Sequence, residues 1–241
     1  MTGHRPTALF LMVLTLAACA APLGDTTTTT LQPLTTASSA AVAPGADRTA
    51  EDWIAAVEAG DVDLARSLLA PRSAAYAASV GGLDTMMTAL AEGWGAWGRA
   101  ADASYAVRRA EVGDQEATVV VITGTVAREA EPSRAATAML ITDDLVDPFA
   151  AAPMIGFVVP RAEFVDLLSP DVPFELGFPA SYRCAFLLDA EDLGPGTPTG
   201  TGRILLTPTT PPAPGEHVLT VVCLGENDSM GAVAVLFQTT P

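Results

Sequence analysis

Apolar residues recur at helical spacing in three stretches of the first half of the chain. A first predicted helix, for which Thr49 is the expected cap, carries Trp53 and Val57 on one side. Asp61 is placed to cap a second helix that ends before Pro71. The third and clearest helix has apolar residues three and four positions apart, at Leu83, Met86, Met87, Leu90, Trp94 and Trp97.

The pattern changes after this third helix. Runs rich in Val, Ile, Thr and Ala over 104–112, 116–126 and 134–142 are typical of strands, and Gly113-Asp114 supplies a turn between the first two. Helices followed by a meander of antiparallel strands predict an α+β domain, which we place at residues 48–147.

A second region, 148–241, follows a boundary of acids, prolines and small residues. Proline- and glycine-rich segments separate short apolar runs in it, which is typical of an all-β sandwich. The strands expected there cover 154–159, 174–178, 181–188, 203–207, 216–225 and 232–239.

Residues 1–18 have the pattern of an export signal. The apolar run Ala8–Ala17 is too short to span a bilayer, which takes about 20 residues, but it has the length of a signal-peptide core. The following Leu-Ala-Ala-Cys19 resembles the lipobox of bacterial lipoproteins. This resemblance implies cleavage before Cys19, lipid such as palmitate on that cysteine, and an anchor on the extracytoplasmic face of the membrane. The alternative is an ordinary secretory signal followed by a chance cysteine.

Residues 19–47 are expected to form a disordered tether. The segment is rich in Thr, Ala and Pro, includes an unbroken run of threonines at 26–30, and carries only two charges after Cys19. Without apolar periodicity it cannot bury enough surface to offset the entropy cost of ordering. Such tracts resemble glycosylated stalks, so glycosylation is a hypothesis for this segment.

Charge and composition exclude several classes of function. The 241 residues include 12 Arg, no Lys and 28 acidic residues, for a net charge of −16, which repels nucleic acid and anionic lipid. Beyond the export segment the one histidine is His217, so a histidine-based metal site and a Ser-His-Asp triad are not expected, and we expect no cofactor. The acidic clusters at 189–192 and 226–228 are interpreted as solvated turns rather than calcium sites.

The segment Trp-Ile-Ala-Ala-Val-Glu-Ala-Gly-Asp at 53–61, with Leu-Ala-Arg-Ser-Leu-Leu at 64–69, resembles the helices of NTF2-like (cystatin-like cone) domains. The resemblance implies a cone-shaped cavity between helices and sheet. Enzymatic members of that family use a polar dyad in the cone, and the residues available here are Asp84, Asp102, Tyr76 and Tyr105. A candidate pocket is formed by Trp53, Tyr76, Trp94 and Trp97, although aromatic residues at helical spacing also suit a core.

The second region resembles bacterial Ig-like domains at the string Pro-Gly-Glu-His-Val-Leu-Thr-Val-Val, residues 214–222, which looks like the start of a late strand. Cys184 and Cys223 each lie in a predicted strand, and export provides an oxidising compartment. We therefore expect a Cys184–Cys223 disulfide that links the two sheets of the sandwich. Two buried free thiols are the alternative.

Three functions remain open. The first is a lipid-anchored, non-enzymatic binding or interaction module whose partners are envelope proteins or a small apolar ligand. The second is an isomerase- or cyclase-like enzyme that works in the cone, and the third is a structural protein of the envelope. A carboxylate of raised pKa beside a tyrosine in the cone would favour the enzyme.

Overall fold

The computed structural model describes residues 45–94, 102–127, 132–148, 156–160, 166–177, 182–199, 202–225 and 229–241. Helices come first and β-strands follow, in the order expected from the apolar pattern. The helices are α1 (Ala46–Ala59), α2 (Val62–Ser67), α3 (Pro71–Ser79) and α4 (Leu83–Trp94).

The described strands form three sheets. The helix-covered sheet has the order β1-β2-β3-β4, the central sheet the order β6-β13-β12-β8-β9, and the outer sheet the order β10-β11-β7-β5. The strand bounds are β1 Ser104–Val112, β2 Gln115–Ala127, β3 Pro132–Thr142, β4 Leu145–Asp147, β5 Gly156–Val159, β6 Asp166–Leu168, β7 Phe174–Gly177, β8 Arg183–Leu188, β9 Glu191–Asp192, β10 Thr197–Pro198, β11 Arg203–Leu206, β12 Gly215–Leu224 and β13 Met230–Thr239.

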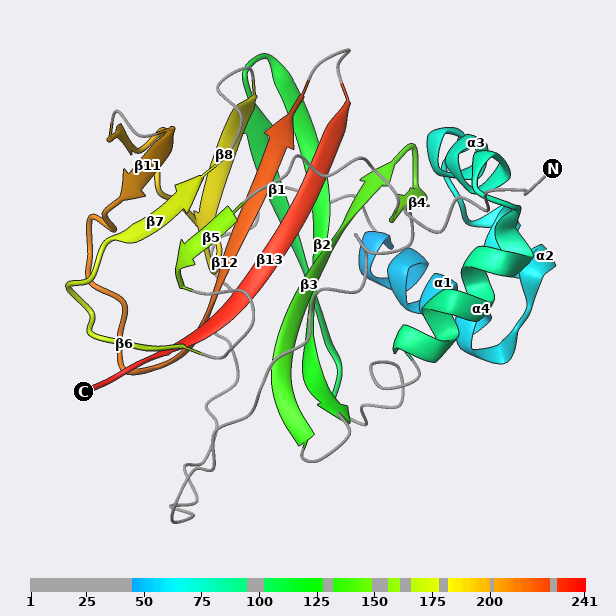
Figure 1. Cartoon of the computed structure of the whole chain (residues 1–241), viewed down its shortest axis with the longest axis horizontal. Helices are drawn as coiled ribbons and strands as arrows, with labels where there is room; N and C mark the ends of the chain where they lie inside the picture. The colour runs from blue at the N-terminus through cyan, green and yellow to red at the C-terminus, as the bar shows by residue number, and fades with distance from the viewer. Residues whose placement is uncertain are drawn as a thin grey trace, which may run out of the picture.

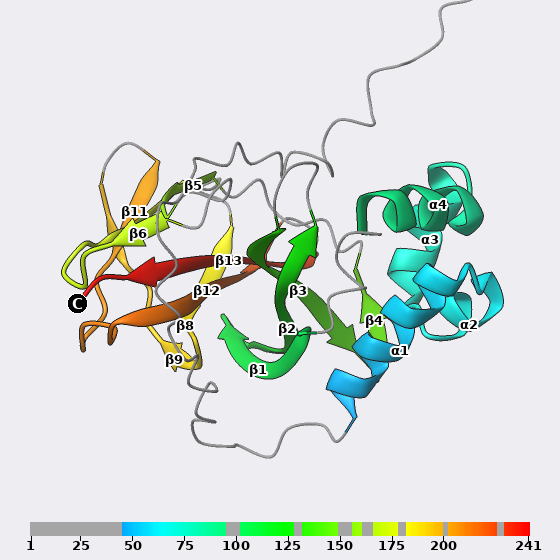
Figure 2. The same ribbon diagram turned by 90° about the horizontal axis from the view of Figure 1, so that it is seen from below.

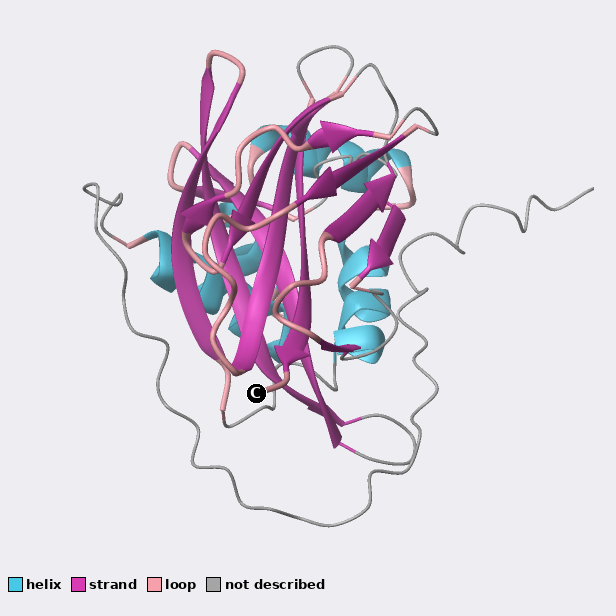
Figure 3. Ribbon diagram, turned by 90° about the vertical axis from the view of Figure 1, so that its left-hand side faces the viewer, coloured by secondary structure: helices cyan, strands magenta, loops and turns pink. Residues whose placement is uncertain are grey.

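These elements stack in four layers (Figures 1 and 2). The helices pack on one face of the helix-covered sheet, whose other face packs on the central sheet. The outer sheet covers the remaining face of the central sheet, so the two predicted regions share an apolar layer. Figure 3 looks from the outer-sheet side, with the helices behind the strands.

Helix α1 starts earlier than its sequence suggests. Its N-cap is Gly45, and Thr49, the expected cap, lies inside the helix, where its hydroxyl donates to the Gly45 carbonyl at 3.1 Å. The Thr49 prediction was therefore wrong, because the side chain satisfies a carbonyl of the preceding turn instead of a free N–H. The cap at Asp61 is confirmed, since its carboxylate accepts from the Leu64 N–H at 3.0 Å.

Helix α3 is an element that the sequence analysis did not predict. It begins with Pro71 in the first turn, where the missing N–H costs nothing, and it buries only small residues, Ser73 and Ala77. The connection that leads into it pairs with β4: the Ala70 N–H donates to the Val146 carbonyl, and the Val146 N–H to the Leu68 carbonyl, both at 2.8 Å. Backbone hydrogen bonds thus hold α3 against the helix-covered sheet.

Strands in the middle of the stack are apolar on both faces. In β12, Val218 and Val222 face the helix-covered sheet, whereas Leu219 and Val221 face the outer sheet. Strand β2 repeats this arrangement, with Val120 and Ile122 toward the helices and Val119 and Val121 toward the central sheet. Burial on both faces explains why these strands are nearly continuous apolar runs instead of alternating ones.

The Cys184–Cys223 disulfide is present, but its expected placement was wrong. The two cysteines are directly opposite each other on β8 and β12, which are neighbours in the central sheet. The bond therefore joins two strands of one sheet and does not link two sheets. It lies in the apolar layer toward the outer sheet, where Cys223 is fully buried.

A polar cluster at Asp147 ties the layers together at one edge. Asp147 ends β4 with 2% of its surface exposed and accepts hydrogen bonds from Arg72 and Ser73 of α3. Arg72 also donates to the Met230 carbonyl of β13 at 2.9 Å. One guanidinium thus connects the helices, the helix-covered sheet and the central sheet.

A second ion-pair cluster joins the helix-covered and central sheets. Arg134 of β3 binds both carboxylate oxygens of Glu216 in β12, at 2.7 and 3.1 Å, and also pairs with Asp102 at 2.9 Å. Asp102 is held in turn by the side chain and backbone of Thr125. The paired guanidinium fixes the lateral position of one sheet on the other, which apolar packing alone does not.

Thr220 places a hydroxyl inside the apolar layer between the helix-covered and central sheets. It is fully buried on the same face of β12 as Val218 and Val222, and its oxygen has no hydrogen-bond partner within the described ranges. We expect Thr220→Val, which keeps the shape and removes the desolvated hydroxyl, to raise the free energy of unfolding by about 1–2 kcal/mol in denaturant titration.

The reverse change two residues away is the matched control. Val218→Thr puts a hydroxyl into the same layer and should lower the free energy of unfolding by a similar amount. A Thr220→Val variant less stable than the natural chain would mean that the hydroxyl has a partner.

Candidate functional site

Side chains fill the space between the helices and the helix-covered sheet, where the cone of the resemblance was expected. Trp53 of α1 is fully buried there, and Val57 and Met87 join it from the helices. The sheet contributes Val120 and Ile122. Residues from three elements, α1, α4 and β2, thus meet in one packed apolar cluster.

The structure places the four candidate pocket residues in different surroundings. Trp53 is part of the core, whereas Tyr76 lies on α3 with 43% of its surface exposed. Trp94 is the last residue of α4, and its side chain is not described. Trp97 lies outside the described residues.

The carboxylates and tyrosines expected for an enzymatic dyad also have separate environments. Burial raises the pKa of Tyr105, which packs against the helical core, and the charges of Glu51 and Glu58 raise it further. The pKa of Asp102 is lowered, because the two hydrogen bonds that Thr125 donates to its carboxylate outweigh the effect of burial, which alone would raise the pKa, and the charge of Arg134 lowers it further. Asp102 therefore stays ionised and shows the opposite of the shift that a buried general acid needs.

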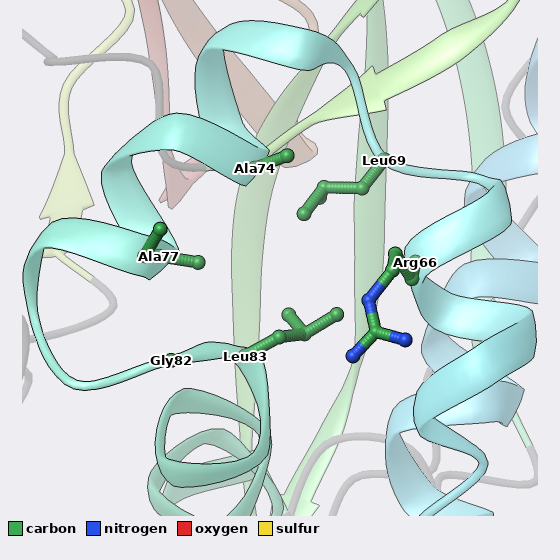
Figure 4. A pocket seen from close by; sticks show the side chains of 7 residues that line it. Arg66, Leu69, Ala74, Ala77, Gly82 and Leu83 are labelled. Carbon is green, nitrogen blue, oxygen red and sulfur yellow. The ribbon is translucent and has the colours of Figure 1, made fainter.

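A hollow that the sequence analysis did not predict lies between α2, α3 and the start of α4 (Figure 4). Its volume is about 210 Å³. Its lining is mostly apolar and consists of Arg66, Leu69, Ala74, Ala77, Ala78, Gly82 and Leu83. The sequence signal for this hollow is the set of three alanines on one face of α3, Ala74, Ala77 and Ala78. Short side chains leave a hollow only where the helices stand far enough apart, and the sequence does not show that spacing.

His217 is the centre of a half-buried polar cluster at the start of β12. Its Nδ1 lies 2.8 Å from an Asp189 carboxylate oxygen and its Nε2 lies 2.6 Å from the Ala213 carbonyl. Both ring nitrogens thus face acceptors, and only the protonated imidazole can donate to both. Burial by itself would lower the pKa of His217, but the hydrogen bonds to Asp189 and Ala213 and the charges of Asp189 and Glu216 outweigh it and raise the pKa.

The acidic turn that includes Asp189 is held by internal hydrogen bonds. Asp189 has a positive φ of 56°, and its second carboxylate oxygen accepts from the Val218 N–H at 2.9 Å. Asp192 accepts from the Gly194 N–H at 2.8 Å. Across the described ranges, no three or more His, Cys, Asp or Glu side chains gather as a metal site would require, and residues 226–228 lie outside those ranges.

The two hydrogen bonds of the His217 ring predict that the stability of the protein depends on pH. Because its pKa is raised by folding, the stabilisation is complete below the ordinary histidine pKa of about 6.5 and is lost as pH rises through the higher folded value. We expect the free energy of unfolding to fall by on the order of 1 kcal/mol between neutral and mildly alkaline pH, as one charge-assisted hydrogen bond is lost. Denaturant titrations at a series of pH values measure it.

His217→Gln is the control for this pH series. The only other histidine is His4, in the expected export segment, so the variant should show a flat profile in the same window. An unchanged slope in His217→Gln would assign the titration to another group.

Within the part of the chain that the structure describes, no helix has the length and apolar character needed to cross a membrane. The expected export segment and Cys19 lie outside that part. No protein-family model matches this chain, and no curated protein matches it either.

Proposed function

We propose that this chain is an extracytoplasmic lipoprotein, held at a membrane by lipid on Cys19, whose folded body is a non-enzymatic binding or interaction module. As part of the same proposal, we assign residues 48–147 to an NTF2-like fold and 148–241 to an Ig-like sandwich. The helices that cover a meander sheet support the first assignment, and the packing of the central sheet on the outer sheet supports the second.

The observation that carries the proposal is the packed space between the helices and the helix-covered sheet. Trp53 lies there with none of its surface exposed, among side chains of α1, α4, β2 and β3. An enzyme of the cone type needs room for a substrate between the helices and the sheet. A filled space instead suits a rigid module that binds partners on its outer surface. The lowered pKa of Asp102 likewise favours the non-enzymatic function over the enzymatic one.

Features of the sequence support the proposed extracytoplasmic location. The lipobox-like Leu-Ala-Ala-Cys19, the Thr- and Pro-rich tether and the Cys184–Cys223 disulfide all suit a protein that is exported to an oxidising compartment and held there by its N-terminus. One acyl chain binds a membrane only marginally, whereas two or more chains on one residue make the attachment persistent.

Metabolic labelling tests the anchor. The full chain, expressed in a bacterium that processes lipoproteins and fed labelled palmitate, should carry the label and fractionate with membranes. Cys19→Ser should lose both properties. Adding Ser39→Cys to that variant should not restore them, because the new thiol lacks the lipobox. Label retained in Cys19→Ser would contradict lipidation at this position.

Truncating Trp53 tests the packed interior. Trp53→Ala should lower the free energy of unfolding by about 3–5 kcal/mol, the cost of removing a large aromatic side chain from a core. Leu64→Ala, at a position with 44% exposure on α2, should cost far less and is the control. A Trp53→Ala loss no larger than the Leu64→Ala loss would show that the indole lines an open site, and would revive the enzymatic alternative.

A further inference from the structure

The hollow between α2, α3 and α4 has a floor that belongs to the core. Leu69, which lies between α2 and α3, and Leu83, the first residue of α4, point into the hollow. Their exposed fractions are 4% and 8%. One wall consists of Ala74, Ala77 and Ala78 of α3, whose short side chains leave the space empty. An apolar group placed there would exchange water contacts for contacts with these methyl groups.

A single cation stands at the mouth of the hollow. Figure 4 shows the guanidinium of Arg66 reaching from α2 toward Leu83. It pairs with Asp63, 3.1 Å away on the same helix, and the two side chains are 57% and 96% exposed. An exposed pair of this kind contributes little, and the guanidinium keeps donors for a second carboxylate.

The volume limits what the hollow can hold. At about 210 Å³ it exceeds an engineered cavity of about 150 Å³ that admits benzene. It is smaller than the sites of about 300–1,000 Å³ that enclose drug-sized ligands. The hollow has the size to enclose one apolar side chain and is too small to enclose a larger ligand.

We propose that this hollow binds the C-terminal residue of a polypeptide partner, with an apolar side chain against Leu69 and Leu83 and the terminal carboxylate on Arg66. The inference rests on the proposed interaction function and names its site and partner. A C-terminal residue carries an apolar side chain and a carboxylate together, and the apolar floor and the guanidinium line the same hollow. The half-open mouth leaves the rest of the partner chain a way out.

Titration of the full chain in detergent with short peptides tests the proposal, with detergent alone as the blank. The probes are a Gly-Ser hexapeptide that ends in leucine with a free carboxylate, its C-terminal amide, the same peptide ending in glycine, and hexanoate. We expect the leucine acid to bind about tenfold or more tightly than the amide or the glycine peptide, because each of these lacks one of the two contacts. Hexanoate should bind more weakly than the leucine acid.

Two variants separate the contacts. Arg66→Gln should abolish the preference for acid over amide, and Ala78→Leu, an exposed lining position, should fill the hollow and weaken all binding about tenfold or more. Arg48→Gln and Ala75→Leu, which are exposed and do not line the hollow, should behave like the natural chain.

Several outcomes would overturn the proposal. They are equal binding of acid and amide, unchanged binding by Ala78→Leu, hexanoate binding as tightly as the peptide, and no binding of any probe. None of these bears on palmitate labelling at Cys19 or on the cost of Trp53→Ala. Failure of this site is therefore distinguishable from failure of the proposed function.

Discussion

Burial of the central sheet on both faces is the constraint on which the rest of the structure depends. Strand β12 lies between β13 and β8, and from Val218 to Leu224 every residue is buried. The outer sheet and the face of the helix-covered sheet that is turned away from the helices both pack on this one sheet, so both depend on it. The cross-strand disulfide between β8 and β12 joins two strands of the sheet that supports both neighbours.

Apolar layers hold the sheets together without fixing how one lies on the next, because the hydrophobic effect has no direction. The polar clusters at the edges provide that direction. Arg72 binds Asp147 and the Met230 carbonyl, and Arg134 binds Glu216 and Asp102. With arginine as the only strong cation of the chain, each of these clusters uses a planar fork that binds two acceptors at once.

The sequence predicted the long strands well, since β1 has the expected bounds Ser104–Val112 and β12 differs from its prediction by one residue at each end. Helix α3 was missed because the residues that it buries are small, so no large apolar side chains mark its inner face. The pairing of Cys184 with Cys223 was predicted correctly, but the prediction that it links two sheets was wrong. Which strands become neighbours in a sheet is decided by the tertiary fold and cannot be read from the spacing of two cysteines. The hollow beside Arg66 could not be predicted, since its size depends on how far apart three short helices stand.

If the body is held by its N-terminus, as proposed above, the order of the layers has a mechanical consequence. A force applied through the segment before Gly45 is felt first by α1, at the start of the helical layer, which is attached to its sheet mainly by side-chain packing. The central sheet lies two layers away and is closed by hydrogen bonds along β8, β12 and β13 and by a covalent bond. Under tension we expect the helices to detach and unfold before the sheets separate. The helical layer would thereby protect the strands from the applied force.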